Sequence, residues 1–489
     1  MAGIGFALRK TLERRTFTAY VRAYMASLAY ASGPWICTIV ALGGIVAFAS
    51  SSLPETVVEQ FTVTTVYIYA FSLLLSGGIQ VLTTRYVSDQ LYRKNEEEIS
   101  PAIVTALLLT MTLSLLLGTI CARLASLPPA LELSGIFLFC LVNGLWVIMS
   151  YITCLKDYSL VTGAFFFGMV LATSLALLLS FYGPYPLLGL VWGYSAGHLF
   201  VFAVLVHRSF KELHGDWQFS FGYLSYFRRY PLLLLIGFLT NLAIWIDKFV
   251  IWFHHGSAVW GIFFFYPLYD IPAYLAYLTA IPSTAFFLIK VETNFARQFE
   301  DFIDALLNHP SVVIREKKLS MIESVYSGLG QLLSLQGVIT LICMMTAQEI
   351  LDFLWLDECS TTLFRFFLLA AYCHFAFLHI IILLMYFDKR REIFLLLSFF
   401  VICSAGSSHL LASYGDIHYF SLGYLLAAAL SAAIAARMLF AKLEQSDADI
   451  LFRQPLINAR GEVIRLRECT DGIHGGRVLL ASSTNPAKK

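Results

Sequence analysis

Long apolar stretches recur along this chain of 489 residues, and they restrict it to very few folds. Each stretch has about 20 residues, the length that crosses the hydrocarbon core of a bilayer as a helix. The stretches are too long and too unbroken for the strands of a membrane barrel. Helices and closed barrels are the only spanning structures, because lipid offers the backbone no hydrogen bonds. The sequence therefore predicts an all-α membrane protein, as its 58% hydrophobic and 13% charged residues also indicate.

We count twelve predicted spans. The first long polar loop follows the sixth span and divides the chain into two halves of six helices, the organisation of a duplicated transporter. The predicted spans are residues 24–50, 61–83, 102–121, 133–154, 160–182, 187–206, 231–253, 261–289, 326–346, 361–386, 393–413 and 417–440.

The predicted domains follow from these spans. Residues 24–206 form an N-terminal six-helix lobe and residues 231–440 a C-terminal one, joined by a cytoplasmic loop over 207–230. Residues 1–23 combine an apolar face with basic residues, which predicts an amphipathic helix lying at the membrane surface. The polar tail 441–489 is too short for a sizeable core, and we expect it in the cytoplasm.

The basic residues orient the predicted spans in the membrane. With the N-terminus in the cytoplasm, 30 of the 33 Lys and Arg lie on the cytoplasmic side. On the outer side there is only Arg123, while Lys248 and Arg365 fall within spans. Basic loops stay on the cytoplasmic side of membrane proteins, so we expect both termini in the cytoplasm.

The sequence lacks the motifs of common pumps and membrane enzymes. No G-x-x-x-x-G-K-[ST] loop for ATP and no protease signature occur. The nine cysteines include no C-x-x-C pair, so we predict neither a disulfide framework nor a zinc site. His374 and His379 lie five residues apart on one span, which favours polar contacts over a metal or haem. We interpret the acidic run 447–449 as a solvated turn, and we expect no enzyme activity and no cofactor.

Four ionisable residues are predicted at similar depth inside the C-terminal lobe. They are Asp247 and Lys248 in span seven, Asp270 in span eight and Arg365 in span ten. Neighbours on a helix point about 100° apart, so we expect each charge to pair across helices. Asp247 with Arg365 and Asp270 with Lys248 is one neutral assignment, and the exchanged pairing is equally possible.

The role of these charges stays open from the residues alone. One reading is a static polar lock within the C-terminal lobe. Another is a water-filled cavity in which the charges serve as a gate, a polymer contact or a coupling-ion site. A third lets Lys248 reach the outer headgroups. In the N-terminal lobe His198 is the one ionisable residue within a span, and we expect it to make a plain hydrogen bond.

Span eight has a composition that favours a bent helix lining a substrate path. Prolines remove backbone hydrogen bonds and kink helices, and tyrosines can contact the faces and edges of sugar rings. Simple packing of the tyrosines is the alternative. The residues concerned are Pro267, Pro272 and Pro282, with Tyr266, Tyr269, Tyr274 and Tyr277.

Several segments resemble the PelG family of Pel exopolysaccharide transporters. They are MAGIGFALRKTL at the N-terminus, SGPW in span one, TRYVSDQLY after span two, IDKFVIWF in span seven and YDIPAYLAYLTAIPSTAFFLIKVETNF in span eight. The resemblance covers residues 1–440. Ala7 departs from it, since an acidic residue is expected there in that family.

The resemblance implies a MATE-like flippase fold, with two six-helix lobes around a central cavity that work by alternating access. It implies a protein of a bacterial inner membrane that moves an N-acetylhexosamine-rich polymer from cytoplasm to periplasm, for secretion into a biofilm matrix. The implied partners are the polysaccharide, the lipid bilayer, a cytosolic Pel glycosyltransferase and other Pel inner-membrane proteins, including a cyclic di-GMP receptor. It implies no nucleic acid and no established catalytic residues.

Two further functions are compatible with the sequence. A MATE-type small-molecule or cation antiporter has a similar span count, although no carboxylate lies within the N-terminal spans to bind a coupling ion. A membrane polysaccharide polymerase fits less well, because the outer loops are too short to hold a catalytic domain.

Overall fold

The computed structural model describes residues 17–154, 157–212, 218–354, 358–447, 456–457 and 463–464. Twelve helical stretches among them are long and apolar enough to cross a membrane, and they coincide with the twelve predicted spans. The chain divides into two compact units, residues 1–443 and 444–489. The second unit includes two paired antiparallel strands, β3 (Leu456–Ile457) and β4 (Val463–Ile464). Residues 441–444 of the predicted tail belong to the last helix, and residues 448–455, 458–462 and 465–489 lie outside the described residues.

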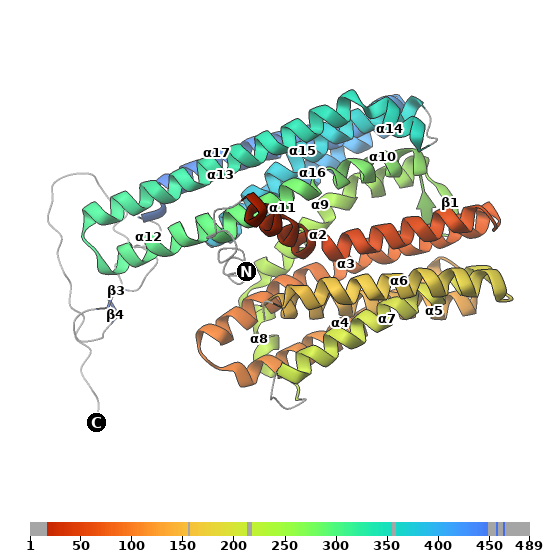
Figure 1. Cartoon of the computed structure of the whole chain (residues 1–489), viewed down its shortest axis with the longest axis horizontal. Coiled ribbons are helices and arrows are strands. Elements are labelled where there is room, and N and C mark those ends of the chain that lie inside the picture. The colour runs from red at the N-terminus through yellow and green to blue at the C-terminus, as the bar shows by residue number, and fades with distance from the viewer. Residues whose placement is uncertain are drawn as a thin grey trace. The chain divides into compact units, whose positions relative to one another are not determined.

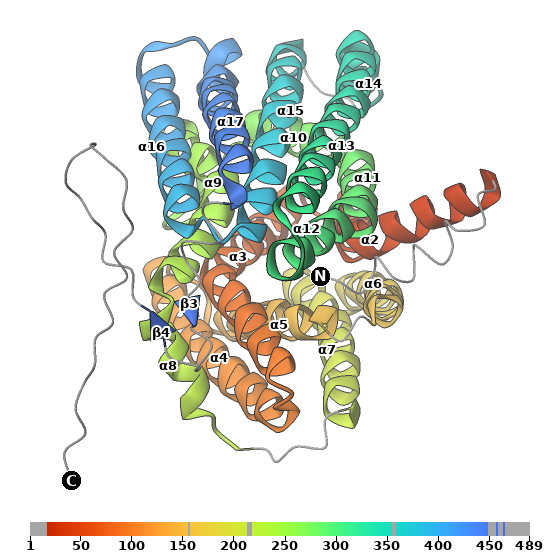
Figure 2. The same cartoon turned by 90° about the vertical axis from the view of Figure 1, so that its left-hand side faces the viewer.

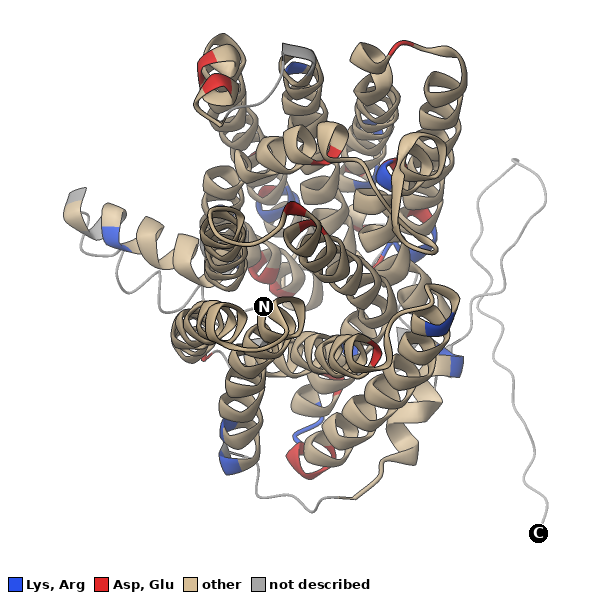
Figure 3. Ribbon diagram, turned by 90° about the vertical axis from the view of Figure 1, so that its right-hand side faces the viewer, with Lys and Arg blue, Asp and Glu red and all other residues tan. Residues whose placement is uncertain are grey.

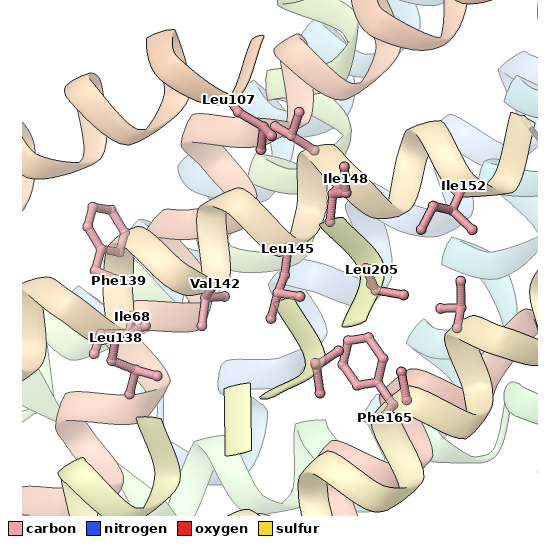
Figure 4. Packing of buried hydrophobic residues seen from close by; sticks show 14 of the residues in the cluster. Ile68, Leu107, Leu138, Phe139, Val142, Leu145, Ile148, Ile152, Phe165 and Leu205 are labelled. Carbon is pink, nitrogen blue, oxygen red and sulfur yellow. The ribbon is translucent and has the colours of Figure 1, made fainter. Parts of the chain in front are cut away.

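The first six spans form the N-terminal lobe (Figure 1). Their buried apolar residues make one continuous core, part of which is shown in Figure 4. The helices are α2 (Phe17–Ser50), α3 (Glu55–Tyr92), α4 (Ile99–Leu124), α5 (Pro129–Cys154), α6 (Tyr158–Tyr182) and α7 (Pro186–Glu212), with a 3₁₀ turn at Glu96–Glu98. The short helix α8 (Phe221–Arg229) then leads into the second half of the chain.

The last six spans form the C-terminal lobe, whose helices α13 to α17 stand side by side in Figure 2. The elements are α9 (Pro231–His255), α10 (Pro267–Leu278), α11 (Ile281–Lys290), a π turn (Val291–Phe295), α12 (Ala296–Asn308), α13 (Ser311–Met345), α14 (Ala347–Phe353), α15 (Glu358–Tyr386), α16 (Arg390–Tyr414), a 3₁₀ turn (Ile417–Tyr419) and α17 (Phe420–Glu444).

Two packing contacts within the N-terminal lobe recur in the C-terminal lobe. In the first lobe span one (α2) packs on span five (α6), and span two (α3) packs on span four (α5). In the second lobe span seven (α9) packs on span eleven (α16), and span eight (α10 and α11) packs through α10 on span ten (α15). Contacts between the lobes are reciprocal as well, because span one meets span eight and span two meets span seven. Such reciprocity is typical of two related units that face each other.

A small β-hairpin precedes the helices of span eight in this otherwise helical fold. Strands β1 (Ser257–Trp260) and β2 (Phe263–Phe265) pair antiparallel, and β2 falls within the stretch predicted as the start of span eight. Gly256 ends α9, and Gly261 adopts a φ of +43° in the turn, a conformation that favours glycine. We call the end of the helical bundle that carries this hairpin the hairpin end. The other end, which holds Arg93 and Tyr230, is called the opposite end.

Span eight is broken as predicted, but its three prolines act differently from one another. Pro282 lies in the first turn of α11, just after the break at Thr279 and Ala280. Pro267 does not kink a helix, because it stands in the first turn of α10, where a missing N–H costs nothing. Pro272 is the one of the three that lies inside a helix.

The bounds of two predicted segments can be compared with the structure only in part or with a change. The proposed helix over 1–23 lies outside the described residues except for 17–23, which belong to α2. Figures 1 and 2 show the first part of α2 pointing away from the direction of the other spans. Span nine, expected over 326–346, belongs to a longer helix, α13, which begins at Ser311 and packs on α12.

At Gly77 and Gly78 the two lobes come into direct backbone contact. A Cβ atom added to Gly77 on α3 would lie 2.7 Å from the carbonyl oxygen of Gly237 on α9. One added to Gly78 would lie 2.6 Å from the carbonyl oxygen of Leu234. Small residues permit such close approach between membrane helices, so these glycines set the spacing of α3 and α9.

We expect Gly78→Ala to destabilise the protein, because its methyl group would push α9 away from α3. Overpacking of this kind costs about 1–3 kcal/mol. The matched control is Gly43→Ala on α2, where an added Cβ has no atom within 4 Å. Thermal unfolding of both purified variants in one detergent tests this. Equal midpoints for the two variants would contradict the proposed close contact.

Candidate functional site

Asp247 and Lys248 lie at the centre of a buried polar network in the C-terminal lobe. Asp247 is fully buried and Lys248 is 6% exposed. The Lys248 ammonium lies 3.2 Å from each carboxylate oxygen of Asp247 and donates to the carbonyl oxygen of Ile244 at 3.0 Å. The Tyr269 hydroxyl on α10 donates to Asp247 at 2.9 Å. The two neighbouring charges thus neutralise each other, and Tyr269 ties the pair to span eight.

This arrangement corrects the predicted pairing across helices. We expected neighbours on one helix to point too far apart, but the long Lys248 side chain bends back to Asp247. Arg365 is exposed on α15, and the described residues offer it no ion pair. The sequence placed these charges at similar depth, yet depth alone does not tell which side of a helix faces a partner.

A second chain of polar contacts extends from Lys248 into the lobe. The ammonium lies 5.4 Å and 5.5 Å from the ring centres of Tyr277 and Tyr424, within range of a cation–π attraction. The hydroxyls of these two tyrosines hydrogen-bond each other. The Tyr424 hydroxyl also lies 2.9 Å from Nδ1 of His374. The polar network therefore joins spans seven, eight, ten and twelve.

Asp270 has a different partner from the one expected. Its two carboxylate oxygens accept from Nε1 of Trp252 at 2.9 and 2.8 Å. Trp252 is buried and stacks on Tyr67 of α3, with ring centres 5.0 Å apart. The Tyr67 hydroxyl in turn donates to the carbonyl oxygen of Phe264 and accepts from its N–H. Asp270 therefore anchors an aromatic contact between α9, the hairpin and the N-terminal lobe.

The other tyrosines of span eight divide between packing and exposure. Tyr269 and Tyr277 are buried within the lobe, and Tyr266 packs, partly buried, beneath the hairpin. Tyr274 is 40% exposed on the other side of α10, and its hydroxyl has no hydrogen bond to a described residue. Of the four tyrosines predicted to line a path, Tyr274 alone has this exposed position.

A smaller polar cluster lies in the N-terminal lobe. The Tyr69 hydroxyl on α3 lies 2.7 Å from the Tyr194 hydroxyl and 2.8 Å from Nε2 of His198, both on α7. Nδ1 of His198 lies 2.9 Å from the carbonyl oxygen of Tyr194. His198 thus makes the ordinary hydrogen bonds expected from the sequence. Tyr274 of span eight lies within electrostatic range of both Tyr69 and Tyr194, so this cluster is on the side of span eight.

An open pocket of about 460 Å³ lies between the lobes at the hairpin end. Its volume is within the range of pockets that bind small molecules. Residues of α2, α3, β2 and α10 line it, namely Ser50, Glu55, Val58, Glu59, Thr62, Phe265 and Pro267.

Sequence reasoning missed several members of these clusters. Tyr424 and Tyr194 lie in spans that carry no unusual pattern, and Trp252 reads as one apolar residue among many. His374 was noticed and interpreted as a polar contact, but its partner was not identifiable. The useful signal would have been the helix face on which each span carries its hydroxyl groups. Buried hydroxyl groups on one face require hydrogen-bond partners.

We expect Asp247→Asn to destabilise the C-terminal lobe, because it leaves the Lys248 ammonium buried without a counter-charge. Breaking one side of a buried ion pair costs about 3–5 kcal/mol. The double variant Asp247→Asn/Lys248→Met should lose less than the sum of the single variants, with a coupling of about 0.5–3 kcal/mol. Unfolding midpoints of the purified variants measure this coupling.

The control for this cycle is Arg365→Met. Because Arg365 is exposed on α15, its loss should add to that of Asp247→Asn within about 0.5 kcal/mol. Coupling between positions 247 and 365, with none between 247 and 248, would restore the pairing expected from the sequence.

Comparison with known proteins places these features in a family. The family model of PelG, described as "Putative exopolysaccharide Exporter (EPS-E)", matches residues 1–450. This range includes both lobes. No curated protein matches the chain.

Solved structures with a similar fold are MATE and related transporters. One titled "Crystal structure of MATE P26A mutant" has a TM-score of 0.62 at 11% identity, covering 87% of this chain and 97% of its own. An outward-facing multidrug resistance MATE transporter of the MOP superfamily has a TM-score of 0.61 at 11% identity, with 87% and 96% covered. A MOP superfamily transporter from Pyrococcus furiosus reaches 0.60 at 11% identity, with 87% and 96% covered. The fold is therefore that of the MATE transporters, and the chain belongs to the PelG family of exopolysaccharide exporters.

Proposed function

We propose that this exporter moves Pel polysaccharide between its two lobes, from the opposite end to the hairpin end. The family match over residues 1–450 carries this proposal, because it includes every described span. The MATE-like fold supports it, since it supplies two lobes that can rock against each other. The pocket between α3 and α10 at the hairpin end would be the exit through which the polysaccharide leaves the exporter.

In this proposal the opposite end faces the cytoplasm and the hairpin end faces the periplasm of a bacterial inner membrane. The distribution of Lys and Arg supports this orientation. Arg85 and Arg390 both lie against the ring of Tyr230 at the opposite end. Figure 3 looks onto the hairpin end and shows acidic residues at several of the near helix ends.

The partners follow from the direction of transport. A cytosolic Pel glycosyltransferase would deliver the growing N-acetylhexosamine-rich polymer to the opposite end, where other Pel membrane proteins, including a cyclic di-GMP receptor, would dock. The paired helices α12 and α13 present charged residues such as Asp301 and Lys317 for such contacts. The exporter itself would carry out no catalytic step.

The Asp247–Lys248 network serves, in our proposal, as a static lock within the C-terminal lobe. Both side chains are buried, neutralise each other and connect span seven to span eight through Tyr269. A lobe held together in this way can move as one body, which alternating access between two lobes requires.

Deleting the chromosomal gene tests the function. We expect secreted polymer to be lost while the glycosyltransferase in cell extracts stays active, because synthesis and export are separate steps. Re-expression of the intact chain should restore secretion. Normal secretion with altered drug tolerance would instead support a small-molecule antiporter, and loss of synthesis in extracts would support a polymerase.

The orientation has its own test. A cysteine-free variant with single cysteines in place of Ser52 and Asn95 should react with a membrane-impermeant thiol reagent on opposite sides. Ser52 lies at the hairpin end and should react in intact spheroplasts, whereas Asn95 should react only after lysis. The reverse result would invert the proposed direction.

A further inference from the structure

The pocket at the hairpin end continues into the membrane along two facing helices. On α3 its lining residues Glu55, Glu59 and Thr62 share one helix face. Tyr69 lies on the same face seven residues beyond Thr62, which is about 10.5 Å further along the helix. The helix repeat therefore places Tyr69 below the pocket on this face of α3.

The C-terminal lobe mirrors this arrangement. Pro267 lines the pocket from α10, and Tyr274 follows on the same face seven residues later, again about 10.5 Å along the helix. Two helical turns below the pocket, Tyr69 and Tyr274 thus face each other from the two lobes. Tyr274 lies within electrostatic range of Tyr69 and Tyr194, which agrees with this position.

Tyr274 is placed like a binding residue rather than a packing residue. The buried side of α10 carries Tyr269, Ala273, Ala276 and Tyr277, and Tyr274 lies on the other side. Its ring is 40% exposed and its hydroxyl has no hydrogen bond to a described residue, although it belongs to a membrane span. A polar group at membrane depth needs water or a ligand as its partner.

The wall across from Tyr274 offers fixed hydrogen-bonding groups. The Tyr69 hydroxyl is held by the Tyr194 hydroxyl and by Nε2 of His198 at 2.7 and 2.8 Å. Nδ1 of His198 donates to a carbonyl oxygen, so Nε2 accepts the proton of the Tyr69 hydroxyl, and the Tyr194 hydroxyl donates to Tyr69. The Tyr69 oxygen therefore keeps one lone pair that can accept a hydrogen bond from a ligand. An aromatic ring on one side and fixed hydroxyls on the other suit a pyranose ring, which has apolar C–H faces and polar edges.

From this geometry we infer that Tyr274 and Tyr69 form a saccharide-binding clamp between the lobes. One sugar unit of the exported chain stacks on the Tyr274 ring, and its hydroxyl or amide groups hydrogen-bond to Tyr69. The next units reach the hairpin end through the pocket beside Glu55 and Glu59, whose carboxylates accept hydrogen bonds from sugar hydroxyls. This inference rests on the proposed export function and assigns its substrate contacts.

Photo-cross-linking in cells that produce the polymer tests the contact directly. Benzoylphenylalanine in place of Tyr274 or Tyr69 should attach polymer to the exporter on illumination. The same probe in place of Phe167, an exposed residue of α6, should not. Cells with an inactive glycosyltransferase should give no adduct at any position. Adducts absent at both tyrosine positions, in cells that still secrete polymer, would overturn the clamp.

Secretion measured at equal exporter level in the membrane gives a second readout. Tyr274→Ala should lower secreted polymer about tenfold and Tyr274→Phe by less than about threefold, because phenylalanine keeps the stacking ring. The control Phe167→Ala should secrete normally. Full secretion by Tyr274→Ala in a strain whose secretion needs the exporter would reject the clamp alone. Normal secretion without the exporter would reject the proposed function instead.

Discussion

The absence of water in the bilayer is the constraint on which the rest of this structure depends. Each span satisfies its backbone as a helix, and polar side chains must then find partners inside the lobes. Asp247 meets this requirement with Lys248 and Tyr269, and Asp270 meets it with Trp252. The buried polar groups therefore hold specific helices together, which a purely apolar bundle in lipid would do less selectively.

The contacts within the C-terminal lobe differ in kind from the contacts between the two lobes. Within the C-terminal lobe, charged and hydroxyl groups connect spans seven, eight, ten and twelve. Between the lobes, the glycines of α3 contact the backbone of α9, and aromatic rings such as Tyr67 and Trp252 stack beside them. The lobes therefore meet through close packing, aromatic stacking and the hydrogen bonds of Tyr67 with Phe264, whereas the C-terminal lobe contains a buried ion pair.

The sequence identified residues of the buried polar network but not their partners. It selected Asp247, Lys248, Asp270 and the tyrosines of span eight because charges and tyrosines are rare in apolar spans. It assigned the wrong partners, since the flexible Lys248 side chain reaches its own neighbour. It did not find Tyr69 or Trp252, because one tyrosine or tryptophan in a span gives no sign of its contacts.

The amino-acid sequence by itself determined the number of spans, the break in span eight and the sorting of basic residues between loops. Each of these features follows from the local composition of the chain and from the known thickness of the lipid bilayer. Only the tertiary structure decided that residues 257–265 form a hairpin, that Arg365 stands apart from Asp247, and that Tyr69 bonds to Tyr194 and His198. Those features depend on the rotation of each helix about its axis, which side chains from distant spans fix together.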